Sequence, residues 1–163
     1  TKTLLEMSHL QQVARTEQIE LAPMIEEIFT DLAPLAEKRN ITLEHEGDAT
    51  MTGSDALIYR MLFNLTENAV KYNRPGGSVK VLVCQTEQAL RIRVCDTGCG
   101  IPAEYQRSIF QPFFRVDKSR SREFGGAGLG LSLVWEIAGL HGGSVLVEES
   151  SDKGTTIAVE LPI

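Results

Sequence analysis

The chain has 163 residues, of which 42% are hydrophobic and 23% charged, and its formal net charge is −6. This composition is that of one ordinary globular domain, and the acidic balance excludes a general nucleic-acid-binding protein, which would carry a broad basic face. No apolar run approaches the roughly 20 residues of a membrane span, but the chain does not begin with Met, so we expect a piece of a larger protein that can carry an anchor elsewhere.

The first half of the chain alternates helices with a strand. Residues 1–14 and 22–38 have apolar side chains at helical spacing, and residues 41–46 (ITLEHE) alternate like a strand. Residues 54–72 predict a strong amphipathic helix that begins at Ser54 or Asp55 and ends before the Pro and Gly of NRPGG. Its apolar stripe consists of Ile58, Met61, Leu62, Leu65 and Ala69.

The second half is richer in strands. Residues 78–84 and 90–95 alternate cleanly and predict a hairpin, followed by a loop over 96–102 and a short helix over 103–110. Residues 111–126 have no period and indicate a long loop, which is usually functional or disordered. A helix over 127–140 and a pair of strands over 144–150 and 155–163 complete the pattern. We therefore predict an α/β two-layer sandwich, a mostly antiparallel sheet with helices on one face.

Polar residues form a second stripe on the helix over 54–72. Asn64, Asn68 and Lys71 stand at i, i+4 and i+7, away from the apolar stripe. Two amide oxygens can ligate a hydrated Mg²⁺, and an ammonium can neutralise phosphate. A solvated helix face would also explain the pattern.

The segment DTGCGIP follows the second strand of the hairpin. It places Asp96 at the edge of the sheet, where a carboxylate can accept a hydrogen bond from an exocyclic amine such as that of adenine. Gly98 and Gly100 remove side chains and permit a positive φ. An ordinary turn is the alternative. Neighbouring Cys99 could bring a thiol near a ligand, although Cys84, Cys95 and Cys99 have no zinc-type spacing and are expected to be reduced.

Four glycines within six residues precede the helix over 127–140. Glycines at 125, 126, 128 and 130 would let phosphate approach the backbone N–H groups of a helix N-terminus. Basic residues stand just upstream, at Arg115, Lys118, Arg120 and Arg122. The segment is neither a Walker loop nor a dinucleotide fingerprint. It predicts an anion site on an acidic protein, or else a solvated loop.

Taken in order, four stretches carry a resemblance to a known family. NLTENAVKY, DTGCGIP, IFQPFFRVDKSRSREFGGAGLGLSLV and GTTIAVELP resemble the N, G1, F, G2 and G3 boxes of sensor histidine kinases, with similar spacing from about residue 20 to the end. The wider superfamily includes DNA gyrase, MutL and heat-shock chaperone ATPases. The resemblance implies the Bergerat ATP-binding fold, with ATP and Mg²⁺ held between the Asn-bearing helix and a mobile lid.

The resemblance also implies roles for particular residues. In the helix, Asn68 would ligate Mg²⁺ with Asn64 nearby, Lys71 would approach the phosphates, and Tyr72 would pack near the adenosine. The base pocket would contain Asp96 bonded to the adenine amine, with Gly98, Gly100 and Ile101 lining it and Thr155 or Thr156 beneath the base. Arg115 and Lys118 of the lid would approach the phosphates, and Gly126, Gly128, Leu129 and Gly130 would shape the phosphate loop.

Ala127 departs from many relatives of this kind, and Asn64 separates subclasses of the superfamily. Ala127 stands where many carry Thr or Ser, so a hydroxyl contact to phosphate is missing. Asn64 stands where gyrase-like ATPases carry a water-activating Glu, which favours transfer to a protein nucleophile over hydrolysis, with Glu67 as a possible base. An anti-sigma-factor-like Ser kinase or binding module and a gyrase- or MutL-type ATPase remain the alternatives.

The phosphoacceptor His of such kinases lies on a separate helical hairpin. The Ser8-His9 pair lacks the rest of that motif, so His9 is interpreted as a helix-face residue, and neither His45 nor His141 has a catalytic setting. The resemblance implies that residues 1–16 end the dimerisation hairpin and that 17–163 form the catalytic domain. It further implies a monomeric fragment of a homodimeric parent, a cytoplasmic domain of an inner-membrane sensor, a response regulator as partner, and a fragment unable to phosphorylate itself.

Overall fold

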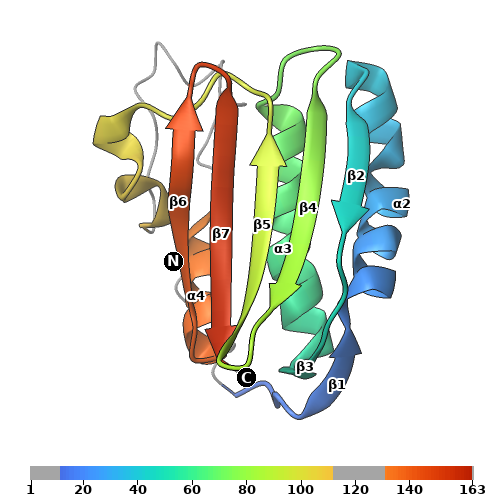
Figure 1. Cartoon of the computed structure of the whole chain (residues 1–163), viewed down its shortest axis with the longest axis vertical. Coiled ribbons are helices and arrows are strands. Elements are labelled where there is room, and N and C mark those ends of the chain that lie inside the picture. The colour runs from blue at the N-terminus through green and yellow to red at the C-terminus, as the bar shows by residue number, and fades with distance from the viewer. Residues whose placement is uncertain (1–11, 112–130, 163) are drawn as a thin grey trace.

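The computed structural model describes residues 12–111 and 131–162. Its main sheet has the strand order β2-β4-β5-β7-β6. These strands are β2 (Thr42–Glu46), β4 (Ser78–Gln85), β5 (Ala89–Asp96), β7 (Gly154–Pro162) and β6 (Ser144–Ser151). The β2–β4 pair is parallel and the other three pairs are antiparallel. Helices α2 (Leu21–Arg39), α3 (Asp55–Lys71) and α4 (Leu131–Leu140) lie together behind the sheet in Figure 1. The predicted two-layer α/β sandwich with helices on one face is confirmed.

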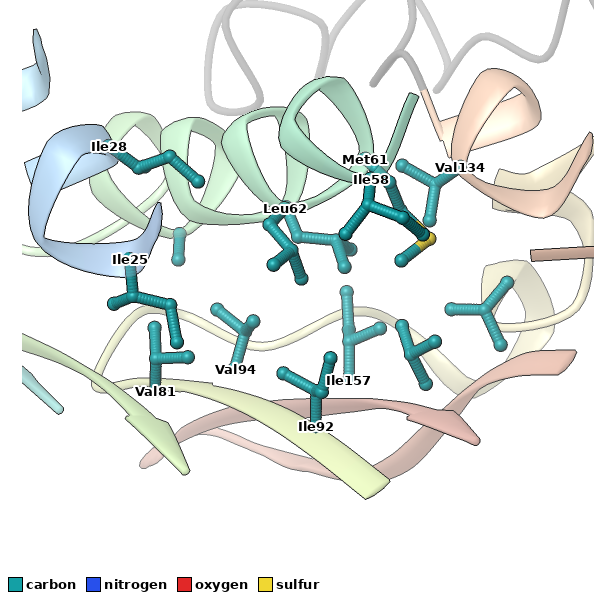
Figure 2. Packing of buried hydrophobic residues seen from close by; sticks show 14 of the residues in the cluster. Ile25, Ile28, Ile58, Met61, Leu62, Val81, Ile92, Val94, Val134 and Ile157 are labelled. Atoms are coloured by element: carbon teal, nitrogen blue, oxygen red, sulfur yellow. The ribbon is translucent and has the colours of Figure 1, made fainter. Parts of the chain in front are cut away.

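The hydrophobic core fills the space between the helix layer and the inner face of the sheet (Figure 2). The alternation of β4 and β5 turns Val79, Val81, Val83, Leu90, Ile92 and Val94 inward, and all six are buried. Every residue of the apolar stripe predicted on α3 is also buried. Because fully burying such a side chain contributes about 1.5–3 kcal/mol, this layer contact dominates the stability of the fold.

The start of α3 follows its capping chemistry. Ser54 is the N-cap residue, and its Oγ accepts a hydrogen bond from the Leu57 N–H at 3.3 Å. Asp55 lies in the first turn, where a carboxylate interacts favourably with the helix dipole. Of the two predicted starting residues, Ser54 is therefore the cap.

Some short elements differ from the prediction. A small two-stranded sheet, β1 (Glu17–Glu20) with β3 (Thr50–Gly53), was not predicted, because β1 buries only Ile19 and has no alternating pattern. The single helix predicted over 103–110 was wrong: two 3₁₀ segments, Ala103–Tyr105 and Ser108–Phe110, occupy this stretch. A helix of eight residues is too short to persist on its own propensity, so packing of Ile109 and Phe110 into the core decides its shape.

Two predicted helices, over residues 1–14 and 127–140, fall partly outside the residues that the structure describes. Residues 12–14 are not helical, which corrects the end of the helix predicted over 1–14, and the rest of that segment lies outside the described residues. In the helix predicted over 127–140, the described part begins at Leu131.

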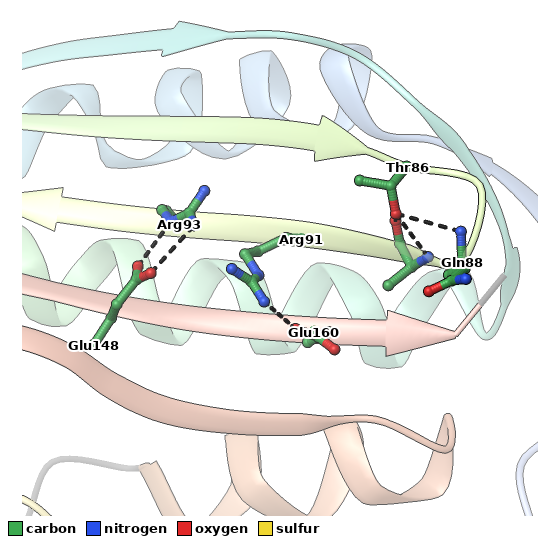
Figure 3. Close-up of polar contacts among 7 residues, drawn as sticks. Thr86, Gln88, Arg91, Arg93, Glu148 and Glu160 are labelled. Atoms are coloured by element: carbon green, nitrogen blue, oxygen red, sulfur yellow. Dashed lines mark hydrogen bonds and ion pairs between the residues drawn. The ribbon is translucent and has the colours of Figure 1, made fainter.

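The outer face of the sheet carries cross-strand ion pairs instead of helices (Figure 3). Arg93 of β5 donates from Nε and an Nη to the two carboxylate oxygens of Glu148 at 2.7 and 3.1 Å. Arg91 pairs with Glu160 of β7. At the β4–β5 turn, Thr86 Oγ1 accepts from the N–H of Gln88 and of Ala89.

Within the described part of the chain, no helix combines the length and apolar character needed to cross a bilayer.

Candidate functional site

A small cavity lies between α3 and the ends of β5 and β7. Its described lining consists of Leu65, Asn68, Ala69, Tyr72, Val94, Asp96, Gly100, Ile101, Leu131, Thr155 and Ile157. Its volume is about 30 Å³. The walls are mostly apolar, with a few polar groups that could fix the orientation of a ligand.

Asp96 supplies the carboxylate of this cavity. Its Oδ1 accepts hydrogen bonds from the Gly98 N–H at 2.8 Å and from the Thr155 N–H at 3.2 Å. Both of these bonds within the described residues go to Oδ1 and neither goes to Oδ2. Burial raises the pKa of the carboxyl, and the two backbone donors oppose that shift. The group is therefore an orientated acceptor held in a poorly solvated place.

The last turns of α3 bring an amide and a phenol to the same cavity. Asn68 and Tyr72 are four residues apart and so lie on one face of the helix. Burial, with the Glu67 carboxylate as a smaller cause, raises the pKa of Tyr72 to about 12. Tyr72 is therefore a neutral aromatic wall at physiological pH.

Two glycines keep the loop after β5 close to its neighbours, for different reasons. Gly100 has φ +81°, and a Cβ there would lie 2.1 Å from the Ser151 carbonyl oxygen. Gly98 has no positive φ, but a Cβ would lie 2.5 Å from the Tyr72 carbonyl oxygen. Only the first of these positions uses the backbone freedom expected from the sequence, whereas the second requires close approach.

The hydroxyl of Thr155 belongs to a chain of polar contacts on the cavity floor. It lies 2.8 Å from Ser150 Oγ, which also accepts from the Ile101 N–H at 2.7 Å. This chain joins β7, β6 and the loop after β5. Thr155 lines the cavity and is 5% exposed, whereas Thr156 pairs with Cys95 and does not line it. Of the two candidates, the structure therefore brings Thr155 to the site.

Several expected site residues lie beside the cavity and not in its wall. Asn64, Glu67, Lys71 and Gly98 are absent from the described lining. The Lys71 Nζ lies 3.5 Å from a Glu67 carboxylate oxygen, so the two charges form an i,i+4 pair on the flank of α3. Cys99 is exposed and does not line the cavity.

The expected phosphate-contacting segment cannot be placed against the cavity. Arg115, Lys118, Gly126, Gly128, Leu129 and Gly130 lie outside the described residues, as does Ala127. Their assigned roles stay predictions.

A polar network that the sequence did not predict supports the site from behind. Asn73, 5% exposed, donates from Nδ2 to the Ser78 carbonyl oxygen at 2.8 Å and accepts from the Thr97 hydroxyl at 2.9 Å. The same hydroxyl oxygen accepts from the Ser78 N–H at 2.9 Å. Asn73 directly follows the NLTENAVKY motif and Thr97 lies within DTGCGIP, so these two motifs were the available signal. The network ties the end of α3 to both strands that frame the loop.

Known proteins that resemble this chain are ATPases of one family. The family model of histidine kinase-, DNA gyrase B-, and HSP90-like ATPases matches residues 53–163. The chain is 35% identical to the sensor histidine kinase RppB of Synechocystis sp., over 98% of this chain and 37% of that protein. It is 36% identical to the sensor protein CiaH of Streptococcus pneumoniae, over 83% of this chain and 31% of that protein. The chain thus spans about a third of the length of these relatives.

Solved structures point to the same class. The catalytic domain of histidine kinase ThkA superposes with a TM-score of 0.79 at 27% identity, covering 91% of this chain and 96% of that one. The mycobacterial sensor histidine kinase MprB gives a TM-score of 0.75 at 27% identity, covering 90% of this chain and 97% of that one. The chain belongs to the histidine kinase-, DNA gyrase B-, and HSP90-like ATPases, as an ATP-binding catalytic domain of the sensor histidine kinase class.

Proposed function

We propose that this domain positions Mg-ATP so that its γ-phosphoryl group is transferred to a His on a separate helical domain, from which it passes to a response regulator. The observation that carries the proposal is the partly buried Asp96 carboxylate in the cavity wall, whose Oδ1 accepts from two backbone N–H groups. We infer that its Oδ2 accepts from the ligand. An acceptor of this kind is complementary to the exocyclic amine of adenine.

We assign the adenine end of the ligand to the described cavity. Asp96 accepts from the amine, Gly100 and Ile101 form the loop wall with Gly98 behind it, and Thr155 lies beneath the base with Thr156 on the other strand face. Tyr72 packs against the adenosine.

We assign the phosphate end to charged and amide groups on the flank of α3 and to the segment beyond residue 111. Lys71 and, from the lid, Arg115 and Lys118 neutralise phosphate. Gly126, Gly128, Leu129 and Gly130 offer backbone N–H groups. Asn68 is the first candidate to ligate Mg²⁺ beside the phosphates, and Asn64 is the second. Glu67 would polarise the incoming nucleophile once Lys71 turns from it to phosphate.

Magnesium fits the residues present as a companion of the nucleotide. Among the described residues, no group of three or more His, Cys, Asp or Glu side chains could hold a metal ion. Mg²⁺ ordinarily keeps several waters and takes one or two protein oxygens together with substrate phosphates. The Asn68 amide oxygen can supply such a protein ligand, and the ion would offset charge on the phosphates.

We propose the parent's organisation from its relatives. Residues 1–16 would end a dimerisation hairpin and 17–163 would form the catalytic domain, in keeping with the first described strand starting at Glu17. The parent would be a homodimeric, inner-membrane sensor with this domain on the cytoplasmic side, and the isolated domain a monomer. ThkA has been solved with the response regulator TrrA, and we propose a partner of that type. We propose no nucleic-acid partner.

The alternatives are less well supported. The relatives RppB and CiaH are a sensor histidine kinase and a sensor protein, and the similar ThkA domain is that of a histidine kinase, which favours the sensor-kinase function over an anti-sigma-factor-like one. Asn64 replaces the carboxylate that would activate water in a gyrase- or MutL-type ATPase, and phosphoryl transfer depends mainly on positioning and charge neutralisation. Sustained ATP hydrolysis by the isolated chain would favour that alternative.

Calorimetry tests the assigned site. We expect Asp96→Ala to weaken Mg-ATP binding roughly 10- to 100-fold, the usual worth of a hydrogen bond to a charged group, and Asn68→Ala to weaken it in the presence of Mg²⁺. Arg93→Met, on the outer face of the sheet, is the matched control. Wild-type affinity in a folded Asp96→Ala protein would remove Asp96 from the site.

A mixing experiment tests the transfer. Labelled ATP and this domain should label a separately prepared hairpin fragment that carries the phosphoacceptor His, while the domain alone stays unlabelled. Absence of label on the hairpin, with nucleotide binding intact, would contradict the proposed transfer.

A further inference from the structure

His141 lies at the C-terminal end of α4, in the segment HGG that the proposed function does not use. Its half-buried imidazole makes two contacts. Nε2 accepts from the Ser54 N–H at 3.0 Å, and Nδ1–H donates to the Ile137 carbonyl oxygen at 2.9 Å. A backbone N–H on one nitrogen and a carbonyl oxygen on the other fit only the neutral ring with its proton on Nδ1.

The contact joins the two helices that reach the cavity. Ser54 is the N-cap of α3, and the opposite end of α3 carries Asn68 and Tyr72. His141 follows α4, and the first described residue of α4, Leu131, lines the same cavity. The imidazole therefore fixes one helix to the other at their ends remote from the cavity.

The packing around the ring leaves little freedom. A Cβ added at Gly53 would lie 2.7 Å from His141 Cδ2, so the ring rests directly on the backbone that enters α3. The next residue, Gly142, has φ +76° and would place a Cβ against Pro162, so the chain that leaves the ring is also closely packed. The imidazole thus lies directly against the start of α3.

Burial and the nearby Arg15 charge favour the neutral ring. Burial lowers the pKa of His141, and Arg15 of the entering chain adds to the lowering, whereas the bond to Ile137 opposes it. From β1, the Glu17 carboxylate is engaged by the Asp55 N–H at 3.2 Å, and the Asp55 side chain lies in the first turn of α3. A proton on Nε2 would face the Ser54 N–H, so two donors would oppose each other and the contact would be lost.

We propose that His141 is a positioning residue whose neutral ring locks α4 to the N-cap of α3, so that its protonation loosens the nucleotide cavity at the other end of both helices. This inference rests on the proposed function for its consequence, because the cavity is where nucleotide would bind. The junction itself is independent of that function.

Nucleotide affinity at two pH values tests the consequence. Gln can accept the Ser54 N–H through Oε1 but does not gain a proton, so we expect the Kd of the wild-type chain for Mg-ATP to rise by roughly five-fold more than that of His141→Gln between pH 7.5 and 5.5. His45→Gln, on β2, is the matched histidine control and should behave as wild type. Any effect of the titration of ATP or of Asp96 on Kd is the same in all three proteins and cancels in the comparison. Equal pH dependence in wild type and His141→Gln would overturn the proposal.

Two measurements without nucleotide test the junction by itself. A His with a lowered folded pKa stabilises the fold above its ordinary value of about 6.5, and this contribution is lost as pH falls through the folded value. The free energy of unfolding should therefore fall more steeply from pH 7.5 to 5.5 in wild type than in His141→Gln. Nitrogen-correlated NMR of the wild-type His141 ring should show the Nδ1–H form at pH 7.5. The Nε2–H form, or an equal pH dependence of the free energy of unfolding in the two proteins, would overturn the proposed junction. Absence of ATP binding in every protein would contradict only the proposed function.

Discussion

Asp96 illustrates at the residue scale how a group proposed to bind ligand can oppose stability. Its folded pKa is raised above the ordinary 3.8 because burial disfavours the charged form. The folded chain then binds a proton more readily than the unfolded chain, so the free energy of unfolding falls as pH rises from 3.8 through the folded value. At neutral pH the ionised carboxylate costs stability that a ligand amine would offset.

Asp96→Asn separates these two effects. The Asn oxygen can still accept from Gly98 and Thr155, and no charge is buried, so we expect the free energy of unfolding at pH 7 to stay the same or rise by about 1 kcal/mol. Mg-ATP binding should weaken at least roughly ten-fold, because the charge on the acceptor is lost. Urea unfolding and calorimetry on one preparation measure both. A variant that binds as wild type would contradict the assigned role, and a marked loss of stability would contradict the argument from burial.

At the scale of elements, the loop after β5 is held by its neighbours and not by its own sequence. Thr97 receives the Ser78 N–H of β4 and donates to Asn73 at the end of α3, and Gly77 is close enough that a Cβ would lie 2.4 Å from Thr97 Oγ1. Thus a hydroxyl joins three elements while the adjacent carboxylate faces the cavity.

Thr97→Val tests this support with little change in volume. It would remove the partner of the Ser78 N–H, whereas Asn73 Oδ1 would keep the Arg74 N–H, so the loss is that of ordinary hydrogen bonds, about 0.5–1.5 kcal/mol. We expect the free energy of unfolding to drop by that amount and amide exchange at Ser78 to accelerate. Thr86→Val, in the exposed β4–β5 turn, is the comparison variant. Unchanged exchange at Ser78 would show that the network does not hold the loop.

For the whole molecule, the two faces of the sheet contribute unequally to the free energy of unfolding. The inner face meets three helices through a continuous apolar core, whereas the outer face carries ion pairs in which Arg93 and Glu148 are 29% and 35% exposed. Ala158, opposite Arg93 in β7, is 6% exposed, so the Arg93–Glu148 pair covers a small residue as it crosses from β5 to β6. Solvent-exposed pairs contribute about 0–1 kcal/mol each.

A pair of truncations measures this asymmetry. Leu62 is 1% exposed, and Leu62→Ala should lower the free energy of unfolding by about 2–5 kcal/mol because it leaves a cavity between α3 and the sheet. Arg93→Met should lower it by about 1 kcal/mol or less. Urea unfolding at pH 7 with matched m-values gives both numbers. A larger loss for Arg93→Met than for Leu62→Ala would contradict the proposed distribution of stability.

Local periodicity was enough to predict most elements of this domain. Helix α3 and the β4–β5 hairpin follow from apolar repeats of 3.6 and 2, since each buries one face against a single opposite layer. The candidate site residues Asn68, Tyr72, Asp96 and Gly100 came instead from the resemblance of short ordered motifs to a known family, and the structure brings these four to one cavity.

Only the tertiary structure decided which distant segments meet. The β1–β3 sheet, the two 3₁₀ segments and the choice of Thr155 over Thr156 depend on packing partners that no local period encodes. The bond between Ser54 and His141 joins residues 87 positions apart. The amino-acid sequence by itself determined which side chains each segment could bury and which groups could bind a ligand. Only the packing of the helix layer on the sheet decided which of those groups face each other, because the neighbours of a side chain depend on segments far away in the sequence.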